Sequence, residues 1–235
     1  MCMICHEDII NKKYIHCNQC LNITTITNIV SLQELYCSDC PLLTTISNIK
    51  YLDKLYFWKC PIVIISNISR LHQLYFMDCS RLTTIPHIAG LQKLHIDNCP
   101  QLTTIPNISG LQYLHCTKAD LLTTIPNISG LKYLQCRECP ALTTISNIIG
   151  LHLLECVLCP VLTIIPDINH SNLRIVDCKW LRKNYHDIYS YNKRIKNIIK
   201  LQKWVRNNLR SQWAQCILEL KILVTNFIKE INSSI

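Results

Sequence analysis

Glycine is scarce in this chain, with four residues in 235. A phosphate-binding loop needs several glycines close together, because its backbone must approach the phosphates closely. The glycines here instead each end one copy of a repeat. The histidines also lack the fixed carboxylate and nucleophile partners of a hydrolytic site. We therefore expect no enzyme activity.

Long apolar runs are missing as well. No stretch approaches the apolar length that spans a bilayer. The first ten residues, MCMICHEDII, place His, Glu and Asp where a signal peptide would have its apolar run. Since 49% of the residues are apolar and 17% are charged, a folded core is expected. We expect an intracellular, cytoplasmic protein without a transmembrane segment and not secreted through a signal peptide.

What the chain does contain is a repeat of about 20 residues. The segment LTTIPNISG occurs at residues 102–110 and again at residues 122–130. Copies of the full unit start at residues 12, 32, 52, 71, 91, 111, 131 and 151, with a partial copy from 170. The step from 52 to 71 is one residue short. A period this regular is typical of a solenoid, in which stacked copies share one core.

The apolar residues of each copy, counted from its first residue, lie at positions 1, 4, 6, 12, 15 and 18, and position 9 is nearly always Cys. Positions 4 and 6 alternate with polar residues, as in a strand with one buried face. The TTIP segment is predicted to turn the chain, because Pro restricts its own φ and the residue before it. No copy has room for a proper helix.

The pattern L-x-x-L-x-C-x-x-C-x-x-L resembles the leucine-rich repeat signature over residues 12–181, in about nine copies. This resemblance implies a leucine-rich-repeat solenoid, with a parallel β-sheet on its concave face and a largely non-helical convex side. The motif LxCxxCPxLTTIPNI is also similar to short repeats in proteins of giant amoeba-infecting viruses. This resemblance implies that the protein is located in the cytoplasm of an infected host cell.

Sixteen cysteines would suggest a disulfide scaffold in a small secreted protein, but most of them here occupy positions 6 and 9. Other copies carry Phe57, Phe76 and Ile96 at position 6 and Ala119 at position 9. A thiol exchanged for these residues behaves as a small buried apolar group. We therefore predict structural, reduced cysteines; adventitious metal binding and disulfides are the alternatives.

The N-terminal cysteines raise a separate question, because Cys2, Cys5, Cys17 and Cys20 form two C-x2-C pairs, a spacing that suits tetrahedral zinc. CMICHEDI followed by CNQC also resembles the opening half of a RING finger. In that family the two pairs bind different zinc ions, and each ion needs a second pair further on. No His-x2-Cys follows here. The hypotheses are one capping zinc on the four cysteines, a RING remnant, or a plain apolar cap.

A row of ring-bearing residues is predicted on the face of the sheet opposite the core. Position 5 carries rings in six consecutive copies, and large side chains at position 7 extend the row sideways. The candidate partner-binding residues are Tyr36, Tyr56, Trp58, Tyr75, Met77, His95 and His115. Exposed aromatic residues on a rigid scaffold are typical anchors of protein interfaces. The alternative is that rings stacked across adjacent strands only stabilise the sheet.

The C-terminal region is strongly basic, with 11 Lys and Arg against 3 Asp and Glu in residues 181–235, whereas residues 1–180 contain 13 against 12. Its apolar residues follow an approximately helical spacing. We predict an α-helical cap over the last repeat, or alternatively a basic helix that binds a calmodulin-like protein, another acidic partner or an anionic membrane. LQKWVRNNLR is similar to the calmodulin-binding IQ motif at Leu201, Gln202 and Arg206. No nucleic-acid recognition module occurs, so nucleic acid is not expected as a partner.

These observations predict three regions: a cysteine-bearing N-terminal cap at 1–20 overlapping the first repeat, the repeats at 12–181, and the basic helical region at 182–235. The expected function is protein binding through the concave face. The alternatives are a degenerate zinc or RING-like adaptor of the ubiquitin pathway and a structural protein of a virion.

Overall fold

The computed structural model describes residues 11–66, 68–166, 172–179 and 181. The chain divides into two compact units, Met1–His186 and Asp187–Ile235, and every described residue belongs to the first. Three predictions fall on residues outside the described part: the zinc ligands Cys2 and Cys5, the helical region 182–235, and the IQ-like segment around Leu201.

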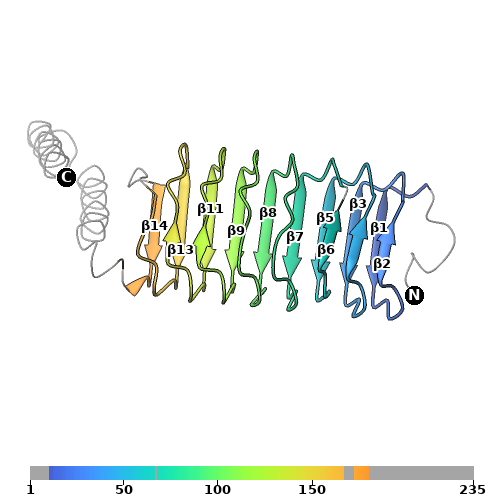
Figure 1. The fold of residues 1–235 in the computed structure, drawn as a ribbon, viewed down its shortest axis with the longest axis horizontal. Coiled ribbons are helices and arrows are strands. Elements are labelled where there is room, and N and C mark those ends of the chain that lie inside the picture. The colour runs from blue at the N-terminus through green and yellow to red at the C-terminus, as the bar shows by residue number, and fades with distance from the viewer. Residues whose placement is uncertain (1–10, 67, 167–171, 180, 182–235) are drawn as a thin grey trace, which may run out of the picture. The chain divides into compact units, whose positions relative to one another are not determined.

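The core of the described unit is a parallel sheet to which each copy contributes one strand (Figure 1). Nine strands are described, and neighbours in this sheet are consecutive copies of the repeat. They are Tyr14–Asn18 (β1), Glu34–Ser38 (β3), Lys54–Trp58 (β5), Gln73–Met77 (β7), Lys93–Asp97 (β8), Tyr113–Thr117 (β9), Tyr133–Arg137 (β11), Leu153–Val157 (β13) and Leu173–Val176 (β14). The chain is thus a parallel β-solenoid of about eight turns, as the repeat predicted.

The register of this sheet is that of the sequence repeat, because the same position of each copy pairs with its equivalent in the next. Leu35 pairs with Leu55 and Leu55 with Leu74, so each steps by 20 or 19 residues. Within a strand such as β5, positions 4 and 6 are buried and positions 3 and 5 are half-buried. The alternation follows from the pleat of the strand, which turns successive side chains to opposite faces.

The core is lined by side chains from the same repeat positions of successive copies. In the copy that starts at Leu32, the six predicted apolar positions are all buried; they are Leu32, Leu35, Cys37, Leu43, Ile46 and Ile49. Cys40 at position 9 joins them. In the short copy, Ile62 is buried while Val63 is 54% exposed. The missing residue therefore lies in the bend after Cys60, where one residue fewer still lets the next apolar side chain reach the core.

The TTIP segment forms more than the predicted turn, because it also pairs between copies on the side opposite the large sheet. Short strands lie there at Thr25–Thr27 (β2), Thr45–Ser47 (β4), Ile64–Ser66 (β6), Thr124–Ile125 (β10) and Thr144–Ile145 (β12). The three-residue strands end in Thr or Ser where other copies carry Pro. Proline has no N–H to donate to a ladder. Copies with Pro86 and Pro106 retain only a bridge between Thr84 and Thr104.

Each strand of the large sheet is followed by a left-handed residue at position 8, which was not predicted from the sequence. Asp39, Lys59, Asn98 and Leu158 are among these residues, with φ between 50° and 56°. The backbone N–H of each donates to the carbonyl of the next copy, as from Asp39 to Trp58 at 2.9 Å. The bend is therefore imposed by pairing between turns, since Lys and Leu have no local preference for this conformation.

The predicted structural role of the repeat cysteines is confirmed. Those at positions 6 and 9 from Cys37 to Cys178 are buried and form no disulfide. Position 9 also has a polar function, because its thiol lies near backbone carbonyls of its own copy and of the preceding copy. Cys139 Sγ, for example, lies 3.3 Å from the Arg137 oxygen and 3.7 Å from the Cys116 oxygen. A weak S–H donor therefore occupies the bend where strands leave the sheet.

From residue 11 to Val176, the elements with defined bounds in the described part of the chain are strands. Within this part of the chain, no helix has the length and apolar character needed to cross a membrane.

Candidate binding surface

Six rings from six consecutive strands form a stack on the outer face of the nine-stranded sheet. We call this stack the ring column, and it consists of His16, Tyr36, Tyr56, Tyr75, His95 and His115. In the first four rings, neighbouring centroids lie 4.2–4.5 Å apart and planes differ by at most 13°. Tyr75 and His95 are 5.7 Å apart and tilted by 32°, and His95 and His115 are again stacked at 4.2 Å.

The spacing of the sheet accounts for this geometry. Strands of a sheet lie about 4.8 Å apart, which is close to the separation of stacked rings. In-register pairing places Tyr36 opposite Tyr56 and Tyr56 opposite Tyr75. The faces of the inner rings are therefore covered by neighbouring rings, and their edges are left toward solvent. His16, at the end of the stack, is exposed, while the other five rings are half-buried.

The hydroxyls of Tyr36 and Tyr75 are fixed by polar residues on their own strands. Tyr36 Oη donates to Glu34 Oε2 at 3.1 Å, and Lys54 Nζ donates to Glu34 Oε1 at 2.8 Å. Tyr75 Oη donates to Gln73 Oε1 at 3.0 Å. Burial, followed by the hydrogen bond with Tyr36, raises the pKa of Tyr56 to about 12. The three phenols of the column are therefore neutral at neutral pH, since the pKa values of Tyr36, Tyr56 and Tyr75 are all raised, first of all by burial.

The two stacked histidines differ in their surroundings. Burial, and then the proximity of His115, lowers the pKa of His95. His115 has a polar partner at each ring nitrogen: Nδ1 lies 3.0 Å from Gln135 Oε1, and Nε2 lies 2.8 Å from Thr117 Oγ1. The two rings stack on each other, and the polar contacts of His115 fix its orientation.

Beyond His115, where the ring column ends, position 5 of the following copies forms a polar network around Glu155, which is only 5% exposed. Glu155 accepts hydrogen bonds from Gln135 Nε2 at 3.1 Å, Arg137 Nη2 at 2.7 Å and Arg174 Nη1 at 3.0 Å. Two guanidinium groups thus compensate one buried carboxylate. This network was not predicted; its sequence signal is the change from rings to Gln, Glu and Arg at position 5.

Beside the column, Trp58 and Met77 form an exposed apolar pair, with 43% and 42% of their surfaces accessible. The two residues are direct register partners on β5 and β7. Trp58 Nε1 donates to Asp78 Oδ2 at 2.9 Å, and Lys59 Nζ lies 4.5 Å from the centroid of the Trp58 rings. The large side chain is therefore held in one orientation while much of its surface remains open.

The hydrogen bonds that Asp78 accepts also determine its charge state. Asn98 Nδ2 donates to Asp78 Oδ1 at 2.6 Å. This bond, and then the one from Trp58, lowers the pKa of Asp78. The carboxylate remains ionised at neutral pH and connects three successive turns of the solenoid.

The seven predicted partner-binding residues therefore lie on one face. Five belong to the ring column, and Trp58 and Met77 lie next to it at position 7. The alternative interpretation was that the rings only stabilise the sheet. Their close stacking supports a stabilising contribution to the sheet. Trp58 and Met77 make no ring stack and remain the open part of the surface.

Two of the four candidate zinc ligands, Cys17 and Cys20, lie in the core, 0% and 3% exposed. The Sγ atoms of Cys17 and Cys40 lie 3.5 Å apart. Among the residues that the structure describes, no group of three or more His, Cys, Asp and Glu side chains has the arrangement of a metal site. The other two candidate ligands lie outside that part, so the four-cysteine zinc site stays a prediction.

Comparisons with protein-family models, with curated proteins and with solved structures found no match for this chain.

Proposed function

We propose that this chain is a protein-interaction scaffold of the leucine-rich-repeat type, and that it binds a partner protein through the outer face of its nine-stranded sheet. The observation that carries the proposal is the pairing of Trp58 with Met77 beside the ring column. Two large apolar side chains are exposed there on neighbouring strands. Trp is among the residue types most enriched at the energetic centres of protein interfaces.

The rigidity of the support favours the same function. A binding residue contributes more when its conformation is already set, because less side-chain entropy is lost on association. Trp58 is held by Asp78 and by Lys59, and the ring column next to it is stacked and hydrogen-bonded. The exposed edges of Tyr56 and Tyr75 would border the partner, while Lys59 and Asp78 would provide the polar rim that such interfaces have.

The test uses two double variants at the same turns of the solenoid. Trp58→Ala/Met77→Ala removes the exposed pair on the outer face. Val63→Ala/Ile64→Ala removes two exposed apolar side chains, 54% and 50% accessible, from the side opposite the large sheet. Both proteins should keep the wild-type circular dichroism spectrum, because no buried side chain is altered.

Peptide ligands would be selected on the immobilised wild-type chain from a random phage-displayed library. Ligands of the proposed surface should bind Trp58→Ala/Met77→Ala at least about tenfold more weakly, since an interface anchor contributes about 2 kcal/mol or more. They should bind the Val63→Ala/Ile64→Ala control as they bind wild type. Ligands that bind both variants equally well, or a selection that yields none, would contradict the proposal.

A further inference from the structure

The two edges of the nine-stranded sheet differ in charge. We call the edge where the strands begin the entry edge; it contains positions 17–20 and 1–3 of each copy. Among the described residues it carries seven basic side chains against the acidic Glu34 and Asp53, a net charge of +5. The basic residues are Lys12, Lys13, Lys50, Lys54, Arg70, Lys93 and Lys132.

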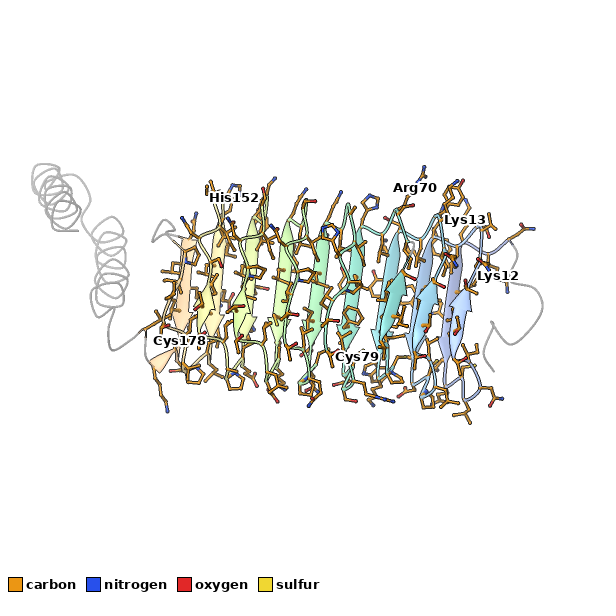
Figure 2. All side chains as sticks on the ribbon, viewed as in Figure 1. Lys12, Lys13, Arg70, Cys79, His152 and Cys178 are labelled. Atoms are coloured by element: carbon orange, nitrogen blue, oxygen red, sulfur yellow. The ribbon has the colours of Figure 1, made fainter. Side chains whose placement is uncertain are left out.

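The opposite edge, where the strands end, contains positions 7–12 and is called the exit edge. Its described residues include five basic and six acidic side chains, a net charge of −1. The basic ones are Lys59, Arg81, Lys118, Arg137 and Lys179, and the acidic ones are Asp39, Asp78, Asp97, Asp120, Glu138 and Asp177. Figure 2 shows Lys12, Lys13, Arg70 and His152 along one edge, and Cys79 and Cys178 of position 9 along the other.

Most cations of the entry edge are available to a partner. Lys54 pairs with Glu34 at 2.8 Å, and His72 lies 2.5 Å from Asp53, so the two acidic groups of this edge have partners already. Within the described part of the chain, no ion pair involves Lys13, Lys50, Arg70, Lys93 or Lys132. The edge therefore presents a line of uncompensated positive charge across successive turns.

Apolar side chains protrude from the same edge. Val30 is 68% exposed and Ile149 is 85% exposed, the largest accessible fraction among the large apolar residues described. Between them Tyr51, 38% exposed, lies near two cations: Lys50 Nζ is 5.5 Å and Arg70 Cζ is 5.1 Å from its ring centroid. Cationic and exposed apolar groups thus occur on the same edge, with Val30 and Tyr51 in its first turns and Ile149 near its other end.

We propose that the entry edge binds the surface of an anionic lipid membrane. Lys and Arg side chains near such a surface are attracted by its negative potential. Aliphatic and aromatic side chains beside them enter the boundary between headgroups and acyl chains, where amphipathic groups are stabilised. The binding is peripheral, through side chains that stand on a rigid edge, and it is separate from the protein-binding face of the sheet.

A membrane explains this edge better than a nucleic acid does. Phosphate contacts with a nucleic acid need the cations only, and exposed aliphatic groups such as Val30 and Ile149 would add nothing to them. Stacking on bases would need several open ring faces. The described tyrosines of this edge are Tyr14, Tyr51, Tyr113 and Tyr133; two cations already lie close to the ring of Tyr51, Tyr113 is half-buried, and Tyr133 has an edge contact with His152.

The test compares two triple variants of the full chain that change net charge equally. Lys13→Glu/Lys50→Glu/Lys93→Glu alters the entry edge, and Arg81→Glu/Lys118→Glu/Lys179→Glu alters the exit edge; all six side chains are exposed. Because both variants retain the same basic region at 182–235, that region contributes equally to each. Thermal unfolding followed by circular dichroism would verify that both are folded.

Binding would be measured by sedimentation with vesicles of phosphatidylcholine, alone or mixed equally with phosphatidylserine. The wild-type chain should pellet with the anionic vesicles only. The partition coefficient of the entry-edge variant should be lower than that of wild type by a factor of about ten or more. The exit-edge variant should stay within about threefold of wild type, since long-range charge effects are screened by salt. Ile149→Ser should weaken partitioning, whereas Leu121→Ser, altering a 46%-exposed residue of the exit edge, should not.

Several outcomes would overturn the proposal. Equal losses in the two triple variants would mean that net charge alone governs binding. Absence of vesicle binding by the wild-type chain would reject the membrane. A parallel titration with fluorescent double-stranded DNA tests the alternative ligand. If the chain binds DNA through the entry edge and does not bind vesicles, the ligand of this edge is a nucleic acid and not a membrane.

Discussion

The rings of Tyr36 and Tyr56 are stacked, with their centroids 4.2 Å apart and an angle of 3° between their planes. The two residues are 20 positions apart in sequence and directly opposite in the sheet. Each of the two rings stacks on a further ring at its other face, so the column ties neighbouring strands together and supports the binding surface that we propose.

Removing a central ring should destabilise the solenoid. Tyr56→Ala removes two stacking contacts at once, the one with Tyr36 and the one with Tyr75. We expect the free energy of unfolding to fall by about 2–3 kcal/mol. Tyr56→Phe retains the ring and should cost less than about 1 kcal/mol. Urea denaturation measures both. As a control, Tyr133→Ala removes a 43%-exposed ring that has only an edge contact with His152. Equal losses for Tyr56→Ala and Tyr133→Ala would contradict a stabilising stack.

Stability should fall as the solution becomes acidic, partly because of His95. Its pKa is lower in the folded chain than in the unfolded chain, where histidine titrates near about 6.5. The unfolded chain therefore binds more protons once the pH falls below that value. Stability then decreases until the pH reaches the folded pKa of His95.

The variant His95→Tyr isolates this contribution, because tyrosine is the residue that neighbouring copies carry in the column. Urea midpoints at about pH 7.5 and about pH 5.5 bracket the ordinary titration of histidine. The decrease in midpoint between them should be smaller for His95→Tyr than for wild type. An unchanged decrease would show that other groups account for the acid sensitivity.

Buried thiols should be unreactive until the chain unfolds. The hydrogen bond with Cys156, together with burial, raises the pKa of the Cys136 thiol, so the reactive thiolate is rare. Pulse labelling with iodoacetamide, followed by mass spectrometry of peptides, should find Cys136 and Cys156 unmodified in native buffer and modified in urea. Labelling of Cys136 in native buffer at the rate seen in urea would contradict the buried core.

Relieving a left-handed residue should stabilise the chain. Leu158 has φ of 56°, a conformation that leucine rarely adopts, whereas Asn tolerates it and occurs at the same position as Asn98. Leu158→Asn should therefore raise the free energy of unfolding by about 1 kcal/mol. Leu121→Asn is the matched control, because both leucines are 46% exposed. If thermal unfolding shows the same change for both, backbone strain at position 8 is not the cause.

Much of the fold could be predicted because the same positions carry the same kind of residue in nearly every copy of the repeat. Leu35, Leu55 and Leu74 recur at position 4 and are all buried, and the rings at position 5 were correctly expected to share a face. The second set of short strands could not be predicted from TTIP. The copies that carry Pro after the TTI segment indicate a turn, whereas β2, β4 and β6 end in Thr or Ser at that place, and only stacking between copies supplies their partner strands.

The candidate sites show the same division. Trp58 and Met77 were identified as outward residues from their place in the repeat. The bonds that orient Trp58 depend on Asp78, which is 20 residues away and becomes a neighbour only in the next turn. Glu155 was placed on the outer face by its position, yet it is buried, since Arg137 and Arg174 converge on it from the same strip of the sheet.

The sequence by itself determined the period, the inward positions and the row of rings, because every stacked copy must bury the same apolar set to exclude water from one continuous core. The tertiary structure decided which residues of different copies meet. Residues 1–180 have nearly equal numbers of basic and acidic residues, 13 against 12. In-register stacking nevertheless gathers the uncompensated cations, Lys50 and Lys93 among them, on the entry edge, since each turn returns equivalent positions to the same side.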